Sequence, residues 1–364
     1  MNNIVEENSR LNAEEYNERK IVLMSYPRSL FIQLDAPCNQ DCLFCSRPSA
    51  YRYFSIDEFK KNYEKTLLPA MERAERLNLT GSGELLLLPE AKKILDYFNQ
   101  FKYTEKMFAT NGSSLTPKMM DTIASSANRY VIHISLHSCM PEYHRLMTKS
   151  DNYGIVLENL AYIKTLKQNG AASRVKVNFI FLATRKNIST LCDFVKFAYE
   201  NNADGIIVYY NYVYRYDQRE LSCFFIKEET NRMLESAFLI NKSLANKYGR
   251  ELQLSLPPRF GQNIYPDRKF CGEAWSQLMI NPEGDVITCD IAGDSHENIL
   301  NKDFMDVWNG NYLTDIRKSI LEDTGGCSKT CPRANPASVN TFRGHLIIRG
   351  KNEEELKRFM DGTG

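Results

Sequence analysis

The sequence predicts an α/β fold: a partial (β/α)6 TIM-like barrel followed by a small domain with a β-hairpin and a helix. Between residues 29 and 212, short runs rich in β-branched and aromatic residues alternate with longer amphipathic stretches. Alternation of this kind implies parallel strands joined by right-handed crossovers. About six strand–helix units fit into this stretch, fewer than the eight units of a closed barrel. The barrel is therefore expected to be partial.

The barrel elements follow from local hydrophobic patterns and from helix-start signals. The expected strands are Leu30–Leu34, Arg76–Leu79, Lys106–Ala109, Arg129–Ser135, Val175–Phe181 and Gly205–Tyr210. The expected helices between them are Ile56–Ala70, Pro89–Phe101, Thr116–Ser125, Asn152–Lys167 and Ile188–Asn201. Thr116 before a proline and Ser55 before acidic residues are favourable helix N-termini, because the side-chain oxygen caps free backbone N–H groups.

The C-terminal part of the chain has a different pattern. A helix is expected at Lys227–Lys247, a Pro/Gly-bearing linker at 256–266, a hairpin from Leu278–Ile280 and Val286–Cys289, and a helix at Phe304–Leu321. The expected division is an N-terminal extension at 1–27, the barrel at 28–225, a linking helix and linker at 226–264, a cysteine-bearing domain at 265–335 and a C-terminal tail at 336–364.

Composition excludes several function classes. The 364-residue chain is 43% hydrophobic and 25% charged, as in ordinary soluble globular proteins. Its 46 Lys and Arg residues balance its 45 Asp and Glu residues, so no global field attracts nucleic acid or an anionic membrane. No apolar run approaches the ~20 residues of a membrane-spanning helix, and the acidic N-terminus lacks the features of a signal peptide. We therefore expect a cytoplasmic protein whose ten cysteines are metal ligands or free thiols.

Three closely spaced cysteines, Cys38, Cys42 and Cys45, form a C-x3-C-x2-C motif after the first expected strand. A disulfide would pair two of them and leave the third, so the motif favours a metal or a cluster. Zinc sites normally close with four protein ligands, and an electron-carrying cubane cluster takes four cysteines. Three cysteines leave one iron open to an outside ligand. The alternative, half of a zinc site, needs a further ligand, and the nearest histidine in the sequence is His133.

This motif resembles the radical S-adenosylmethionine (SAM) signature, including the aromatic residue Phe44 before the last cysteine. The resemblance implies a [4Fe–4S] cluster at Cys38, Cys42 and Cys45, with SAM bound to the open iron. It also implies an external one-electron reductant such as flavodoxin or ferredoxin. In such enzymes SAM is split to a 5′-deoxyadenosyl radical, which abstracts hydrogen from an unactivated C–H group, and the protein supplies geometry and excludes water.

The segment Thr80-Gly-Ser-Gly-Glu84 follows the second expected strand and is similar to the Gly-Gly-Glu segment that binds the SAM amino group in this superfamily. Gly81 and Gly83 would let the backbone approach a ligand, and Glu84 offers a carboxylate to an ammonium group. The alternative for this segment is an ordinary tight turn.

Further SAM contacts are implied by the resemblance at the ends of later strands. Ser135 is a candidate for the SAM carboxylate, Asn178 for the ribose, and Arg185 for the carboxylate as well. For each of them the alternative is a polar group that caps a strand end.

A second cysteine set, Cys271, Cys289, Cys327 and Cys331, lies in the C-terminal third. Its surroundings resemble the auxiliary-cluster extensions called SPASM and Twitch. The longer SPASM form carries seven cysteines, so four cysteines favour a Twitch-type domain with one auxiliary [4Fe–4S] cluster. A structural zinc remains the alternative, because it too takes four thiolates.

Only about 28 residues precede the first strand, which favours a small polar substrate, such as a sugar, an aminocyclitol or a nucleoside, over a leader-dependent peptide. The expected outcome is epimerisation, with Cys223 as a possible hydrogen donor, or dehydrogenation. A buried apolar role is the alternative for Cys223. The alternative function is the maturation of a ribosomal peptide or protein, and a non-catalytic iron–sulfur or zinc protein is the third hypothesis. Plausible substrate contacts are His137, Tyr210, Tyr212, Tyr214, Arg215 and Arg259.

Overall fold

The computed structural model describes residues 3–47, 51–262, 271–289, 297–322, 324, 336–347 and 353–362. In these residues nine strands form one sheet in the order β7-β6-β5-β4-β3-β2-β1-β8-β9. All neighbouring strands are parallel except β8 and β9. The strands are β1 Ser29–Ile32, β2 Arg76–Asn78, β3 Glu105–Thr110, β4 Tyr130–Ser135, β5 Val175–Ala183, β6 Gly205–Tyr210, β7 Gln253–Ser255, β8 Gln277–Ile280 and β9 Val286–Ile287.

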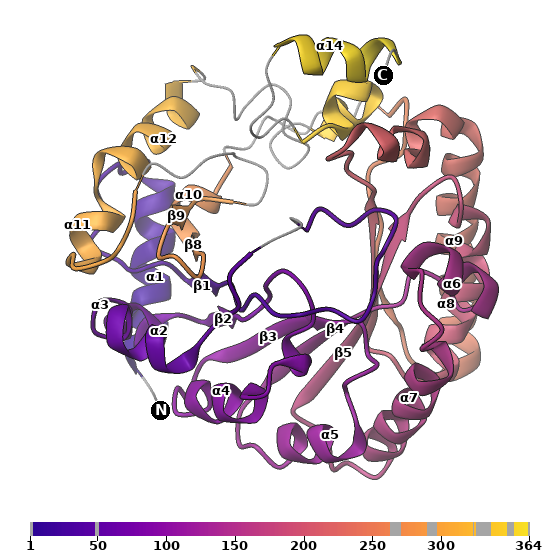
Figure 1. Ribbon diagram of the computed structural model, residues 1–364, viewed down its shortest axis with the longest axis horizontal. Coiled ribbons are helices and arrows are strands. Elements are labelled where there is room, and N and C mark those ends of the chain that lie inside the picture. Colours follow the sequence, from indigo (N-terminus) through magenta and orange to yellow (C-terminus); the bar gives the residue numbers. More distant parts are fainter. Residues whose placement is uncertain are drawn as a thin grey trace.

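The helices of the barrel lie outside the curved sheet (Figure 1). The α-helices are α1 Asn3–Asn17, α2 Ile56–Asn62, α3 Glu64–Arg73, α4 Ala91–Phe98, α5 Pro117–Ala124, α6 Pro141–Thr148, α7 Tyr153–Gln168, α8 Leu191–Glu200, α9 Lys227–Tyr248, α10 Glu273–Ser276, α11 Phe304–Trp308, α12 Asn311–Glu322 and α14 Glu353–Asp361. Short 3₁₀ helices are η1 Leu85–Leu87, η2 Ile188–Thr190, η3 Tyr216–Leu221, η4 Cys223–Ile226, η5 Pro336–Asn340 and η6 Phe342–His345. None of the helices in the described part of the chain has the length and hydrophobicity to cross a bilayer.

The partial barrel predicted from the sequence is confirmed. All six predicted strands are present and pair in chain order, and β8 and β9 form the predicted hairpin. The helix expected at Ile56–Ala70 is instead two helices that meet at Tyr63, whose backbone (φ −127°, ψ −21°) is not helical. The Tyr63 ring packs on Gly284 in the hairpin turn, where a Cβ would lie 2.6 Å from the ring. The break therefore coincides with a contact between distant segments.

The sheet extends beyond the predicted barrel at both edges. β7 lies just before the stretch expected to be a Pro/Gly-bearing linker and pairs with β6, Gly205 opposite Gln253. β8 pairs in parallel with β1, Ser29 opposite Gln277. The hairpin of the C-terminal domain is therefore continuous with the barrel sheet, although the expected boundary at residues 264 and 265 itself stays a prediction.

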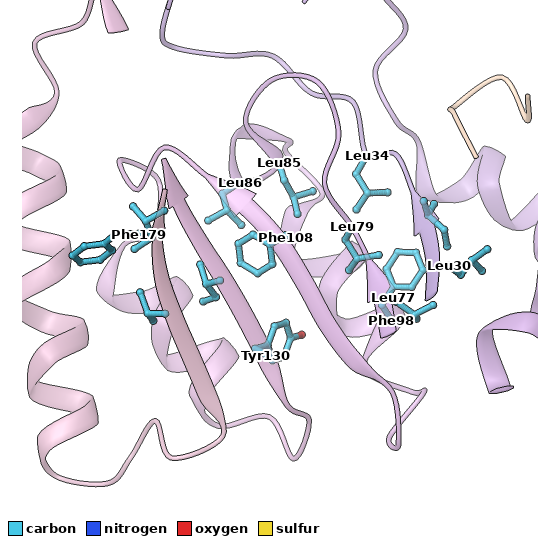
Figure 2. Close-up of a cluster of buried hydrophobic side chains, with 14 of the residues drawn as sticks. Leu30, Leu34, Leu77, Leu79, Leu85, Leu86, Phe98, Phe108, Tyr130 and Phe179 are labelled. Atoms are coloured by element: carbon cyan, nitrogen blue, oxygen red, sulfur yellow. The ribbon is translucent and has the colours of Figure 1, made fainter. Parts of the chain in front are cut away.

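The main core lies between the sheet and the surrounding helices. Strand residues alternate between the two faces of a sheet, and those facing the helices are buried, as in Leu30, Leu77, Phe108 and Phe179, all 0% exposed. Figure 2 shows these side chains in a continuous layer with Phe98 of α4. Each such side chain contributes about 1.5–3 kcal/mol on burial. The opposite, inner face of the barrel strands is half-buried and more polar, and it leads to the site.

Buried polar contacts anchor the C-terminal helices to the N-terminal segment. The guanidinium of Arg317 is 0% exposed and donates to the carbonyls of Ile21, Ala274 and Trp308 at 2.9–3.0 Å. Burial lowers the pKa of Arg317 to about 10. Asn12 of α1 donates to the Trp275 carbonyl at 2.7 Å. These bonds join α1, α10, α11 and α12 to one another and to the segment that precedes β1.

Candidate active site

A cavity of about 380 Å³ lies at the carboxyl ends of the barrel strands and is open to solvent. All six barrel strands contribute to its wall, through their last residues or the loops that follow, which is where parallel α/β barrels place their active sites. The residues that line it are Cys38, Gln40, Cys42, Phe44, Cys45, Ser46, Arg47, Gly81, Gly83, Glu84, Ala109, Thr110, Asn111, Ser135, His137, Leu182, Asn211, Tyr212 and Tyr214. The three predicted cluster cysteines and most of the predicted SAM contacts are therefore brought together.

The cysteine loop after β1 is held by backbone hydrogen bonds from outside the sheet. The N–H groups of Asp41 and Leu43 donate to the carbonyls of Thr148 and Met147 at 3.1 and 3.0 Å, at the C-terminal end of α6. Free carbonyls at a helix end need such partners. Within the loop, Cys45 N–H donates to the Cys42 carbonyl at 3.1 Å. The loop is thus fixed by α6, an element that the sequence did not predict.

The three thiols suit a cubane cluster, in which each thiolate binds a different iron. None of the three is in a disulfide. Burial, reinforced by the neighbouring thiols, raises the pKa of Cys42 to about 12 and also raises that of Cys38. Such thiols ionise when they bind metal.

The Gly-Ser-Gly segment packs directly against the chain that enters the cysteine loop. A Cβ on Gly81 would lie 2.3 Å from the Leu34 carbonyl carbon, and one on Gly83 would lie 1.8 Å from the Ala36 oxygen. Gly83 also has a positive φ of 90°, which side chains disfavour. Ala36 N–H donates to the Ser82 carbonyl at 2.8 Å, and Glu84 N–H to the Pro37 carbonyl at 2.9 Å. The glycines are therefore required for this close approach, whatever they contact in a ligand.

The Glu84 carboxylate has protein partners of its own. It is 1% exposed and accepts from Thr110 Oγ1 at 2.8 Å, from Asn111 N–H at 2.6 Å and from Leu86 N–H at 3.3 Å. Burial raises the pKa of Glu84, and these hydrogen bonds oppose the rise. The carboxylate thus ties the end of β3 to the Gly-Ser-Gly segment. Its predicted contact with the SAM amino group stays a prediction.

Ser135 and His137 reach the cavity from the end of β4. His137 has a left-handed backbone (φ 61°) and its Nδ1 accepts from Leu182 N–H at 3.1 Å. Burial lowers the pKa of His137 to about 3, so the ring is neutral and its proton lies on Nε2. The ring meets Phe44 edge-on, with 4.6 Å between centroids. This pair links the residue before the last cysteine to β4.

Several predicted site residues lie outside the cavity wall that the described residues form: Asn178, Arg185 and Cys223, and the expected substrate contacts Tyr210, Arg215 and Arg259. Asn178 is four residues before Leu182 on β5, so its Cα lies about 13 Å nearer the amino end of the strand. Arg185 pairs with Glu220 at 2.7 Å. Cys223 is 1% exposed in the main core, where burial raises its thiol pKa to about 12. The predicted roles of Asn178, Arg185 and Cys223 remain predictions, but the structure does not bring them to the thiols.

Asn211 is a site residue that the sequence did not single out. It directly follows β6, is 1% exposed and lines the cavity. Its Nδ2 has no hydrogen-bond partner in the part of the chain that the structure describes. A buried amide left unsatisfied costs about 1–3 kcal/mol, which a ligand accepting its N–H would offset. The available signal was its position, since strand ends carry barrel sites.

A larger cavity, about 690 Å³, lies at the opposite, amino ends of the strands. Its wall includes Arg28, Glu75, Arg76 and Glu105. These charges pair with one another, Arg28 with Glu75 at 3.0 Å and Arg76 with Glu105 at 2.8 Å. It holds no thiol among the described residues that line it.

The C-terminal cysteines are only partly described. Cys271 directly precedes Gly272 and α10, and Cys289 follows β9 and is buried. Cys327 and Cys331 lie outside the described residues. The predicted set of four ligands therefore stays a prediction.

Family comparisons agree with this geometry. Residues 37–198 match the radical SAM superfamily, and residues 271–332 match SPASM, an iron–sulfur cluster-binding domain. The chain belongs to the radical SAM superfamily. The SPASM match of this radical SAM chain includes all four C-terminal cysteines. The two domains imply a SAM-binding [4Fe–4S] cluster, an auxiliary cluster and SAM as cofactors.

Several solved structures share the fold of this radical SAM chain at low identity. SuiB of Streptococcus suis bound to its precursor peptide SuiA is 14% identical, with a TM-score of 0.61 over 97% of this chain and 77% of that one. anSMEcpe with bound AdoMet and the Cp18Cys peptide is 15% identical, with a TM-score of 0.61 over 84% and 87%. A histidine-tagged form of anSMEcpe with AdoMet is 14% identical, with a TM-score of 0.64 over 92% of both chains. No protein of curated function matches the chain.

Proposed function

We propose that this radical SAM enzyme modifies a peptide or protein at an unactivated C–H group. The observation that carries the proposal is the open cavity itself, in which three thiols line a space whose mouth is formed by several strand-end loops. A side chain of a longer polymer could enter such a cavity while the rest of the polymer stays outside. The peptide-bound SuiB and anSMEcpe structures, which share the fold, support this substrate class over a small molecule.

Cys38, Cys42 and Cys45 would hold the catalytic cluster, because they are free thiols that line one cavity. Held by these three cysteines, the cluster would supply the one-electron chemistry that cleaves SAM to methionine and a 5′-deoxyadenosyl radical, the hydrogen-abstracting species of this superfamily. An external one-electron reductant supplies that electron. The chain's own contribution is to position the reactants and to exclude water.

Donors at the strand ends would orient the polar groups of SAM. The Nδ2 of Asn211 is buried and unpartnered among the described residues. His137 carries its ring proton on Nε2, because Nδ1 already accepts from the backbone. Ser135 adds a hydroxyl on the same wall. Together they offer hydrogen-bond donors to an anionic or carbonyl oxygen without introducing a competing positive charge.

Tyr212 and Tyr214 would form the substrate side of the cavity, because they lie on the segment after β6 and line the same space. Aromatic rings offer contact area to a peptide side chain at little entropic cost. Epimerisation or dehydrogenation of a small polar substrate stays a prediction. Its proposed donor, Cys223, is buried away from this wall.

The proposal is tested by anaerobic reconstitution of the full-length protein with iron, sulfide, SAM and a strong reductant. Short peptides encoded beside the gene are compared with small polar metabolites suggested by the same neighbourhood. We expect 5′-deoxyadenosine formation together with a mass change in a peptide. Turnover of a small metabolite with every peptide unchanged would refute the peptide assignment, while the superfamily chemistry would stand.

A further inference from the structure

A buried amide, Gln218, joins the loop that carries the cluster cysteines to the loop that lines the substrate side of the cavity. Gln218 lies in η3 and is 0% exposed. Its Nε2 donates to the carbonyls of Leu43 and Cys45 at 3.3 and 3.0 Å. Its Oε1 accepts from the N–H groups of Tyr214 and Arg215 at 3.0 and 3.2 Å.

The orientation of this amide is dictated by its partners. Two carbonyls face one end and two N–H groups face the other, so only one placement of oxygen and nitrogen satisfies all four. Neither a carboxylate nor an apolar side chain of the same size can make this set of bonds. A glutamine is therefore chemically specified at this position.

On the cluster side, the amide binds the carbonyls of Leu43 and Cys45, the two residues on either side of Phe44. Phe44 lines the cavity and contacts His137, and Cys45 is the last cysteine of the motif. Arg215 adds a second link to the same place, because its Nη1 donates to the Cys45 carbonyl at 2.7 Å. The carbonyl of Cys45 thus receives two side-chain donors from the loop after β6.

On the other side, the loop after β6 is itself anchored by the C-terminal segment. Val213 N–H donates to the His345 carbonyl at 2.8 Å, and Ile347 N–H donates to the Val213 carbonyl at 3.1 Å. The Val213 side chain packs with Phe342 and Leu346. Tyr212 and Tyr214, on either side of Val213, line the cavity. Gln218 therefore connects the cysteine loop to a segment that the C-terminal residues hold in place.

We propose that Gln218 is a positioning residue that fixes Phe44 and Cys45 relative to the Tyr212–Tyr214 wall. It sets where the cluster and SAM lie with respect to the substrate and slows loss of iron from the cysteine loop. The role holds whether the substrate is a peptide or a small molecule. Failure of the peptide assignment would therefore leave it unaffected.

The test compares two variants of the reconstituted full-length enzyme. Gln218→Met fills the same volume but removes all four bonds. Gln218→Glu keeps both bonds to the Tyr214 and Arg215 N–H groups and points an oxygen at the two carbonyls of the cluster loop. Asn241→Leu is the matched control. Among the described residues this 5% exposed side-chain amide bonds to Tyr199 and Leu252, and none of the three lines the cavity.

Two readouts do not depend on turnover. The first is the change that SAM causes in the electron paramagnetic resonance spectrum of the reduced enzyme, which isolates the barrel cluster because SAM binds there. The second is the rate of iron release to a chelator, with the auxiliary cluster as the internal reference. We expect both Gln218 variants to alter the SAM-induced spectral change and to release barrel-cluster iron about fivefold faster, the effect of lost hydrogen bonds of ordinary strength.

The control variant should lower the melting temperature without changing either readout. Two results would overturn the proposal. One is a Gln218→Glu enzyme that matches wild type in both measurements, because the bonds to the cluster loop would then be dispensable. The other is an equal change in Asn241→Leu, because general destabilisation would then be the cause.

Discussion

The two ends of the barrel differ in the groups that line their cavities. At the amino end, Arg28 and Arg76 of the larger cavity pair with Glu75 and Glu105, and the buried Ser9 hydroxyl has no partner among the described residues. At the carboxyl end the smaller cavity gathers three free thiols and the Asn211 amide, whose Nδ2 lacks a partner among the described residues. Unsatisfied groups cost free energy that a ligand can return, whereas satisfied groups gain little from one. Cavity volume alone would have selected the wrong end.

Of the changes that test the role of the carboxyl-end cavity, loss of a cluster cysteine should have the largest effect. Cys45→Ala should remove about four irons per chain and abolish 5′-deoxyadenosine formation, because a cubane needs all its protein ligands. Iron analysis and product chromatography measure both. Cys192→Ser, a half-buried thiol on α8 away from the cavity, is the control and should keep full iron content. Cluster retention by Cys45→Ala would show that the motif is not the ligand set.

The next effect concerns the packing beneath the thiols. Gly83→Ala combines a positive φ of 90° with a Cβ that would lie 1.8 Å from the Ala36 oxygen, so the two chains must separate. We expect a loss of more than about 3 kcal/mol in the free energy of unfolding, together with reduced cluster assembly. Denaturant titration and iron analysis check this.

Gly170→Ala is the control for Gly83→Ala. The two glycines share a positive φ, but only Gly83 has close neighbours. The φ of Gly170 is 78°, and no atom lies within 4 Å of the added Cβ. Only the backbone strain of about 1–2 kcal/mol should appear, with normal iron content. If the two variants lose equal stability, the close approach to the cysteine loop is not what requires Gly83.

A smaller effect tests the unpartnered amide directly. Asn211→Leu should weaken SAM binding about tenfold, the loss expected from one hydrogen bond to a charged or strongly polar group. Because the amide is unsatisfied in the protein, the same change should leave the free energy of unfolding equal or slightly higher. Equilibrium dialysis with SAM and denaturant titration separate the two. Reduced stability with unchanged SAM binding would contradict a ligand-binding role.

The sequence predicted the fold and the superfamily well because both depend on local patterns. Strand–helix alternation and the C-x3-C-x2-C spacing are visible in any short window. β7 was missed because it has only three residues, two of them polar and exposed, with no strand pattern. Gln218 was missed for a different reason: its role depends on carbonyls about 170 residues earlier in the chain, and only tertiary packing brings them together.

The seven predicted SAM-contact residues fall into two groups, those that line the cavity and those that do not. Phe44, Gly81, Gly83, Glu84 and Ser135 line the cavity, and each lies in a loop or at the end of a strand, where its place in the barrel unit fixes its position. Asn178 was assigned from its strand alone, but its distance from the strand end decides whether it reaches the site. Arg185 lies past the strand end, but its guanidinium pairs with Glu220 and does not line the cavity. Depth along a strand and competing ion pairs are not encoded by spacing.

The smallest expected effect comes from removing the Arg76–Glu105 ion pair at the amino end. It tests whether the larger cavity is separate from the chemistry at the carboxyl end. The Arg76 side chain is 47% exposed, so its pair with Glu105 is screened by solvent. Arg76→Gln and Glu105→Gln should each change the free energy of unfolding by less than about 1 kcal/mol, with little coupling in the double variant. Iron content, SAM binding and 5′-deoxyadenosine formation should all stay at wild-type levels. A fall in any of the three would mean that the larger cavity takes part in the chemistry, because damage to an exposed ion pair cannot otherwise reach the thiols at the far end of the strands.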